Sequence, residues 1–236
     1  SFNTDQTFTI TGENGALIEY SLDGGGSWNE YTGPVALSDE DTYEVVARQT
    51  VNDLASAFTL TCVVTINKTL PAPPVISGIS GGHYNTDQAF TVAGTEIIVE
   101  YSVNGGTTWT AYDGTVILSS EGEYSITARQ IDTAGNVSSQ VTPITVVIDR
   151  TPPGPPEISG ISDGAYYNNT VNFTINGEDG AVVEYTIDES SWLEYNSEDG
   201  VTLSDENIYT VIARQIDLAG NESEESNTIT ITIDTT

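Results

Sequence analysis

Three observations predict an all-β chain built from three tandem β-sandwich domains. A stretch that alternates apolar and polar residues occurs three times, a turn precedes each copy, and no segment of useful length has helical periodicity. Alternation with period two, rich in β-branched and aromatic residues, is typical of a strand buried on one face. Repetition of a whole unit indicates tandem domains. The repeated stretches are residues 43–49, 124–130 and 209–215.

A tyrosine opens each repeated stretch: Tyr43, Tyr124 or Tyr209. Each follows a turn rich in serine and acidic residues and precedes an apolar position by two residues. This placement is typical of the tyrosine corner of immunoglobulin-like sandwiches, near the start of strand F. We therefore expect each stretch to be strand F, a central strand, in a unit of about seven short strands.

The other strands recur around strand F at matching positions. Residues 8–10 and their counterparts are expected to form strand B, and residues 18–22 and their counterparts strand C, with apolar residues facing in and a Glu facing out. Strand G closes each unit, as at residues 144–148. We expect Cys62 to be a buried small apolar residue of the first strand G. Pro143 predicts an edge position for the second strand G, because proline cannot donate to a strand partner.

Proline-rich junctions divide the chain into three domains, residues 1–69, 70–151 and 152–236. Proline favours a stiff, extended connection. Each junction leads into a segment expected to form strand A, residues 75–79 or 157–161. No such segment stands before Ser1, so strand A of the first domain is expected to be missing.

The chain is strongly acidic: its 236 residues carry 35 acidic and 5 basic side chains, a formal net charge of −30. Such a surface repels nucleic acid and anionic membranes, so we expect no nucleic-acid partner and no membrane insertion. No apolar run is long enough to span a bilayer, and no signal-peptide pattern occurs. The start at Ser1 without a Met indicates a fragment or a processed product, and a single cysteine excludes an intrachain disulfide. We expect a monomer.

Charged pairs are predicted between strands C and F. A Glu of strand C and an Arg of strand F both stand at outward positions of neighbouring strands in every unit. The pairs are Glu19 with Arg48, Glu100 with Arg129, and Glu184 with Arg214. An exposed pair contributes about 0.2–1 kcal/mol, so we expect these pairs to set strand register more than stability.

Each unit also carries a Trp followed three residues later by a Tyr. These residues are Trp28, Tyr31, Trp109, Tyr112, Trp192 and Tyr195. Exposed aromatic rings could stack on sugar rings, and three copies would add avidity, which is the ligand-binding interpretation. In the packing interpretation, the Trp covers one end of the sandwich beside a glycine-rich turn, because a small unit needs large apolar residues for its core.

An Asp-x-Ala-Gly-Asn turn follows strand F in the second and third units. Asp and Asn cap turns and Gly supplies positive φ, so a tight F–G hairpin explains the motif. The alternative is calcium at the interdomain junctions, since calcium is bound by roughly six to eight oxygens. Its candidate ligands are Asp132, Asp149 and Asp163 at one junction and Asp217 and Asp234 at the next. At the first junction Val51, Asn67 and Gly81 stand in these places, so a site there should be absent or weak.

Enzymatic chemistry is not expected. His83 is the single histidine, and no nucleophile–histidine–carboxylate set, metal-ligand spacing or phosphate loop occurs. Neighbouring carboxylates in polar loops are typical of solvated surface.

Several motifs together carry a family resemblance: Tyr-Ser-Leu-Asp-Gly-Gly leading to Trp28 and Tyr31, the Tyr-x-Val-x-Ala strand, the Asp-x-Ala-Gly-Asn turn, and Ile-Asp-Arg-Thr-Pro-Pro before strand A. The whole chain resembles the tandem immunoglobulin-like (Big-type) repeats of bacterial surface and secreted proteins. The Tyr-Ser-Leu-Asp-Gly portion is also similar to the immunoglobulin-like C-terminal domains of chitobiase-type glycosidases. The first copy departs from the pattern, because residues 51–54 replace the Asp-x-Ala-Gly-Asn turn.

The resemblance implies three Ig-like domains end to end, outside the cell or on a bacterial surface. The expected function is a non-catalytic spacer or stalk, as in an adhesin, that holds a terminal functional domain away from the surface. Strands of about seven residues at about 3.3 Å each, together with their loops, give a unit about 35–40 Å long, so three units end to end would reach on the order of 100 Å. Neighbouring repeats of the same polypeptide are the expected partners. The alternatives are a module that binds carbohydrate or a host ligand, and accessory domains of a secreted glycoside hydrolase.

Overall fold

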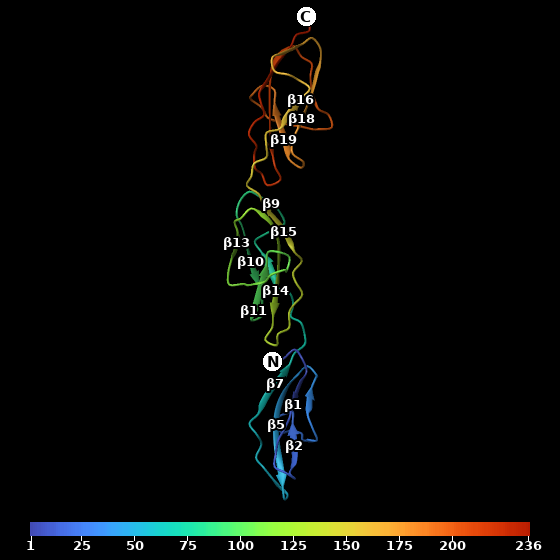
Figure 1. Ribbon diagram of the computed structural model, residues 1–236, viewed down its shortest axis with the longest axis vertical. Helices are drawn as coiled ribbons and strands as arrows, with labels where there is room; N and C mark the ends of the chain where they lie inside the picture. The colour runs from blue at the N-terminus through green and yellow to red at the C-terminus, as the bar shows by residue number, and fades with distance from the viewer. The chain divides into compact units, whose positions relative to one another are not determined.

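The computed structural model describes residues 1–236, and β-strands are its only regular elements (Figure 1). It therefore offers no helix as a candidate membrane span. The chain divides into two compact units: Ser1–Ser77 with Thr91–Gly114 and Ile126–Pro143, and Gly78–Phe90 with Thr115–Ser125 and Ile144–Thr236. No strand pairs across residues 69–70 or 151–152, so each sheet belongs to one repeat. The domain boundaries themselves stay a prediction.

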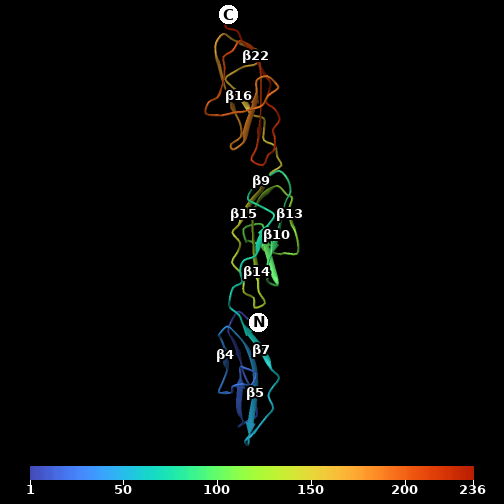
Figure 2. The same ribbon diagram turned by 180° about the vertical axis from the view of Figure 1, so that it is seen from behind.

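The first repeat has a two-stranded sheet, β1-β4, and a larger sheet in the order β3-β2-β5-β6, with β7 also paired to β5. Figure 2 labels β4, β5 and β7 of this repeat. Strand β5 is long because it pairs with β7 along residues 41–45 and with β6 at residues 50–51. The strands are β1 (Gln6–Phe8), β2 (Leu17–Ser21), β3 (Asn29–Glu30), β4 (Val35–Leu37), β5 (Asp41–Val51), β6 (Leu54–Ala55) and β7 (Cys62–Ile66).

The second repeat has a three-stranded sheet, β13-β10-β8, and a five-stranded sheet, β12-β11-β14-β15-β9. Strand β8 is the predicted strand A, and it pairs antiparallel with β10, the predicted strand B. The strands are β8 (Val75–Ser77), β9 (Gly82–Tyr84), β10 (Gln88–Ala93), β11 (Ile98–Ser102), β12 (Thr110–Ala111), β13 (Val116–Leu118), β14 (Gly122–Ile131) and β15 (Ile144–Ile148).

The third repeat repeats this topology, with sheets β16-β18-β21 and β17-β23-β22-β19-β20. The strands are β16 (Glu157–Ser159), β17 (Ala165–Tyr167), β18 (Val171–Asn176), β19 (Val182–Thr186), β20 (Leu193–Glu194), β21 (Val201–Leu203), β22 (Asn207–Ile216) and β23 (Ile229–Ile233). The predicted fold class, tandem immunoglobulin-like β-sandwiches of which the first lacks strand A, is confirmed.

The core of the third repeat lies between its two sheets. Phe173 and Ile175 point inward from β18, and Val211 points inward from β22 of the other sheet. Burial alternates residue by residue along β18, as the period of two requires for a strand covered on one face. Phe173 is 1% exposed and packs edge-on against Tyr185, with ring centroids 6.2 Å apart.

The predicted tyrosine corner is present in every repeat. In each, the Tyr hydroxyl donates a hydrogen bond to the backbone carbonyl four residues upstream, which ties the acidic turn to the start of strand F. The bonds are Tyr43 to Asp39 at 3.0 Å, Tyr124 to Ser120 at 2.8 Å, and Tyr209 to Asp205 at 3.1 Å. Strands β5, β14 and β22 each have neighbours on both sides, so the central position of strand F is confirmed.

The edge position predicted from Pro143 is wrong. Pro143 lies just before β15, and β15 lies between β14 and β9. The short strand β9 pairs parallel with residues 146–148 of β15 and covers its outer side. Strand β17 pairs with β23 in the same way. This parallel strand gives the second and third repeats eight strands where about seven were expected.

The predicted burial of Cys62 is also wrong, because Cys62 is exposed at the start of β7. Its counterparts Ile144 and Ile229 are partly buried. The first repeat has no counterpart of β8 or β16, so the end of its sandwich is open where Cys62 lies. The alternation along strand G correctly predicted the face of the sheet on which Cys62 lies. Its exposure depends instead on strand A, which the first repeat does not contain.

Candidate functional site

The three Glu–Arg pairs form as predicted. Strand register places each Glu of strand C directly opposite its Arg of strand F. The ion-pair distances are 2.7 Å for Arg48–Glu19, 2.7 Å for Arg129–Glu100 and 2.8 Å for Arg214–Glu184. The hydrogen bond from Arg48 holds the pKa of Glu19 below its usual value. These side chains are about a quarter exposed, so each pair contributes modestly to stability.

A tryptophan completes each pair. The guanidinium carbon lies over the indole ring at 4.1 Å for Arg48 and Trp28, 4.2 Å for Arg129 and Trp109, and 4.3 Å for Arg214 and Trp192. We call each Glu, Arg and Trp set a Glu–Arg–Trp stack. A cation over an indole face adds about 0.5–1 kcal/mol at an exposed site. The sequence did not lead us to predict this contact, although an Arg of strand F and a Trp after strand C occur together in every repeat and could have indicated it.

The stack places each Trp on the outer side of the sheet. Arg48 and Glu19 face outward from β5 and β2, so a ring packed on Arg48 lies outside the sandwich interior. The ring also lies beside the glycine-rich turn, since Trp28 Nε1 donates to the Gly25 carbonyl at 3.1 Å. All three Trp side chains are half-buried. The position beside the turn agrees with the packing interpretation, but the partner is an arginine and not the core.

The tyrosines of the Trp–Tyr pairs lie against strand C. Tyr112 packs edge-on against Tyr101 at 6.5 Å between centroids, and Tyr195 packs against Tyr185 at 6.3 Å. Tyr31 is half-buried at the equivalent position, and its N–H donates to the Ile18 carbonyl at 2.8 Å. Edge-to-face pairs contribute about 0.5–1.5 kcal/mol beyond the area that they bury. These rings have a packing role whether or not a ligand also uses them.

The Asp-x-Ala-Gly-Asn motif folds as the predicted tight F–G turn. Asp132 Oδ1 accepts hydrogen bonds from the N–H groups of Ala134 and Asn136, both at 2.8 Å, and Gly135 has a φ of +91°. Asp217 is held in the same way in the third repeat. Burial by itself would raise the pKa of Asp132, but the hydrogen bonds from Asn136 and from the turn N–H groups lower it below its usual value.

The same turn reaches across the junction to the preceding repeat. Asn136 Nδ2 donates to Asp132 Oδ2 and to the backbone carbonyl of Asn67, both at 2.8 Å, and Asn67 Nδ2 donates to Asp132 Oδ2 at 3.0 Å. At the next junction Asn221 Nδ2 donates to the Asp149 carbonyl at 2.9 Å. The sequence did not predict this role of the Asn, because a tight F–G turn already accounts for every residue of the motif.

The candidate calcium ligands group differently from the prediction. Asp132 lies with Asn67 at the first junction, and Asp217 lies on the turn that contacts Asp149 at the second. Asp163 accepts the N–H of Thr230. Asp234 Oδ1 accepts from Thr236, and these bonds lower the pKa of Asp234. The structure contains no group of three or more His, Cys, Asp or Glu side chains arranged to hold a metal.

A glutamine of strand F ties each later repeat to its own proline-rich junction. Gln130 Nε2 donates to the Ala72 carbonyl at 2.5 Å, and Gln215 Nε2 donates to the Gly154 carbonyl at 2.6 Å. Both glutamines are buried, at 2% and 3% exposure. Each side-chain oxygen accepts a backbone N–H of the loop after strand B, as from Thr95 at 2.9 Å. The junction is thereby fixed to the centre of the sheet.

No family model and no curated protein matches the chain. Among solved structures it is similar to the fibronectin(III)-like modules of Clostridium thermocellum CbhA, at 13% identity over 68% of this chain and 94% of that one, with a TM-score of 0.39. It is also similar to the FN1–FN3 domains of chicken CNTN1, at 11% identity over 92% of this chain and 89% of that one, with a TM-score of 0.39. These likenesses concern fold alone.

Proposed function

We propose that this chain is a non-catalytic spacer: a stalk segment of tandem Ig-like domains in a bacterial surface or secreted multidomain protein, such as an adhesin. It would hold a terminal functional domain away from the surface. The single observation that carries the proposal is the hydrogen bond from the F–G turn Asn to the end of the preceding repeat, which occurs at both junctions. A spacer needs repeats that are coupled to their neighbours, and this contact couples them.

Two further features support a stiff connection. Each proline-rich junction restricts its own backbone, and the strand F glutamine anchors it to the following sheet. The last strand of a repeat is also tied to its own acidic corner: Arg150 N donates to Glu121 at 2.7 Å, and Arg150 Nη1 donates to the Ser119 carbonyl at 2.7 Å. Lys68 Nζ donates to the Ser38 carbonyl at 2.7 Å in the same way.

A net charge of −30 agrees with a setting outside the cell and with no nucleic-acid partner.

Small-angle X-ray scattering of the 236-residue chain tests the proposal, first with calcium and then with chelator. We expect an extended particle, with a maximum dimension on the order of 100 Å, in both conditions. Chelation should change little, because the turn carboxylates already accept several protein hydrogen bonds. A compact particle in both conditions would contradict a spacer.

The same experiment also tests whether calcium stiffens one of the junctions. If chelation makes the chain flexible, the sensitive junction should be the second, where Asn221 on the turn of Asp217 donates to the Asp149 carbonyl, and not the first, where Asn67 replaces Asp149. The variant Asp149→Asn, which copies the first junction, should then abolish the response to calcium.

The second candidate function is binding of a glycan or a host ligand through the aromatic residues. The observation that favours it is the presence of three half-buried Trp rings in equivalent stacks. The same stacks have a structural explanation, since each indole packs on an arginine. Accessory domains of a secreted glycoside hydrolase are a further setting for the same architecture, and the neighbouring sequence of the full protein would distinguish it.

We expect Trp109→Ala to destabilise the second repeat by about 1–2 kcal/mol, because it removes the contact with Arg129 and the area that the indole buries. Calorimetry and retention on a glycan array measure the two effects side by side. Trp109→Phe keeps an aromatic ring and serves as the matched control. Loss of retention with an unchanged melting temperature would instead favour the binding function.

A further inference from the structure

Three asparagines of the chain stand directly before a glycine: Asn14, Asn104 and Asn176. Such a pair can lose ammonia without an enzyme, because glycine has no side chain to shield its backbone nitrogen from the carboxamide before it. The reaction requires the asparagine side chain and the following peptide group to turn toward each other. The surroundings of each pair therefore decide which of the three reacts.

Asn104 is held by its own turn. Its Oδ1 accepts hydrogen bonds from Ser102 Oγ at 2.8 Å and from the Thr108 N–H at 2.9 Å, and its Nδ2 donates to Thr108 Oγ1 at 2.8 Å. The side chain must give up these bonds before its Cγ can face the Gly105 nitrogen. A net hydrogen bond contributes about 0.5–1.5 kcal/mol, so the folded turn slows the reaction at Asn104.

Asn176 is held by the packing around the residue that follows it. It is the last residue of β18 and pairs with Glu157 of β16. A Cβ placed on Gly177 would lie 2.5 Å from Gln215 Oε1 and 2.5 Å from a methyl carbon of Val183, so this glycine has no room to rotate. The peptide group between Asn176 and Gly177 is therefore fixed at the end of the strand.

Asn14 has neither restraint. Its side chain is exposed and makes no hydrogen bond within the protein, and the Gly15 N–H makes none either. A Cβ placed on Gly15 would meet no atom within 4 Å. The pair forms the tip of a turn that is closed by one hydrogen bond, from the Ala16 N–H to the Glu13 carbonyl at 3.2 Å. Asn14 and Gly15 are thus free to turn toward each other.

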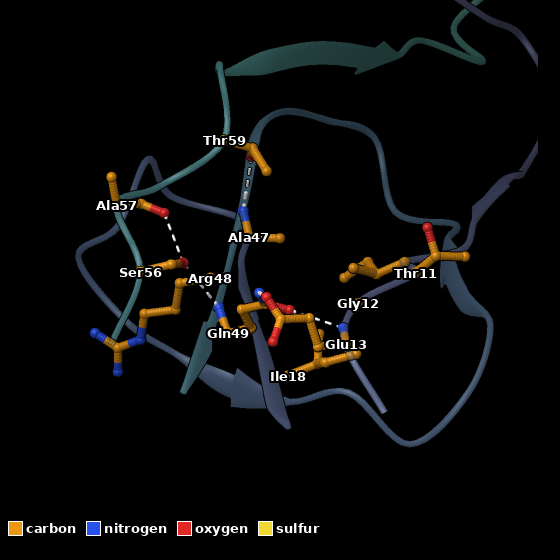
Figure 3. A pocket seen from close by; sticks show the side chains of 11 residues that line it. Thr11, Gly12, Glu13, Ile18, Ala47, Arg48, Gln49, Ser56, Ala57 and Thr59 are labelled. Carbon is orange, nitrogen blue, oxygen red and sulfur yellow. Dashed lines mark hydrogen bonds between the residues drawn. The ribbon is translucent and has the colours of Figure 1, made fainter. Parts of the chain in front are cut away.

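The start of this turn is fixed, so the freedom is confined to its tip. The Glu13 N–H donates to Gln49 Oε1 at 2.9 Å (Figure 3), and Gln49 Nε2 donates to the Glu13 carboxylate at 3.1 Å. The third repeat has an equivalent turn at residues 178–181, closed by a hydrogen bond of 3.1 Å. Asp179 stands there in the place of Asn14, so a carboxylate at this position is compatible with the turn.

We propose that Asn14 is a site of spontaneous deamidation. The Gly15 nitrogen attacks Cγ of Asn14, and the carboxamide nitrogen leaves as ammonia, taking up the Gly15 N–H proton. The product is a cyclic imide, which water then opens. Cleavage of its bond to Cγ gives aspartate and restores the turn of the third repeat. Cleavage of its bond to the backbone carbonyl carbon gives isoaspartate, which lengthens the backbone of the turn by a methylene group.

The test uses the whole chain, incubated at mildly alkaline pH and analysed by peptide mapping with mass spectrometry. We expect Asn14 to convert at least about tenfold faster than Asn104, which must give up more than one net hydrogen bond. Asn176 should also convert more slowly than Asn14. In denaturant, where no pair is restrained, the three rates should converge. Asn14→Gln is the control, because its longer side chain closes a less favourable ring.

Thr108→Ala tests the physical reason for the difference. It removes, at an exposed position, the hydroxyl that accepts from Asn104 Nδ2. Asn104 should then convert about 2- to 12-fold faster, the range of one net hydrogen bond, while Asn14 keeps its rate. Equal rates for Asn14 and Asn104 in the folded chain would overturn the proposal. So would an Asn14 that converts in denaturant but not in the folded chain, because the turn would then restrain it.

Discussion

Replacing Phe173 with alanine is expected to lower the melting temperature of the third repeat well below its value in the parent chain. The ring is 1% exposed and packs between the two sheets, so its removal should cost about 3–5 kcal/mol. In a domain of this size each kcal/mol shifts the melting temperature by about 4–8 °C, which predicts a fall of at least roughly 12 °C. Calorimetry measures the shift, and limited proteolysis with mass spectrometry identifies the repeat that opens.

Tyr166→Ala is the matched control, because Tyr166 belongs to the same repeat and is 81% exposed. It should change the melting temperature little. Since stability in tandem repeats is largely local, the first repeat should keep its own transition in the Phe173→Ala variant. A single transition that moves as a whole would argue that the three repeats unfold together, and it would count against the predicted domain boundaries.

Replacing Asn136 with alanine is expected to loosen the first junction and destabilise the F–G turn. Asn136 is 5% exposed, and the change removes its bonds to the Asn67 carbonyl and to the Asp132 carboxylate. Depriving buried acceptors of a donor costs about 1–3 kcal/mol. The measurement is the distance distribution between spin labels on Cys62 and on a Thr110→Cys position, by pulsed electron paramagnetic resonance. The distribution should broaden in the variant.

Thr133→Ala separates the junction from general damage, because Thr133 lies in the same turn with an exposed side chain. It should leave the distance distribution as narrow as in the parent. If Asn136→Ala also leaves it narrow, the Asn does not couple the repeats, and the spacer proposal loses the contact that carries it.

Much of the fold was predictable because it depends on local pattern repeated three times. Period-two alternation located strands C, F and G, and the Tyr after each acidic turn located the tyrosine corner. The Glu–Arg pairs were predictable too, since register follows once two outward positions on neighbouring strands are known. The Asp and Gly of the F–G turn act within five residues and so appear in the sequence.

The failures have one physical cause, which is that the deciding partner lies far away in the chain. Cys62 has the alternation of a buried residue, but the strand that would cover its end of the sandwich is absent. Pro143 indicated an edge, but a short parallel strand from the start of the repeat covers β15. The calcium candidates were grouped by sequence order, whereas the turn of each repeat in fact contacts the end of the repeat before it.

By itself, the sequence determined the three repeats, the identity and register of their central strands, and the charge of their surface. These properties follow from the composition, from the alternation of apolar and polar residues within each strand, and from the repetition of the whole pattern three times. Only the tertiary structure decided that each Trp lies on an arginine and that the turn Asn reaches the preceding repeat. Each of these depends on whether a distant segment is present at one place in space, and no local pattern reports that.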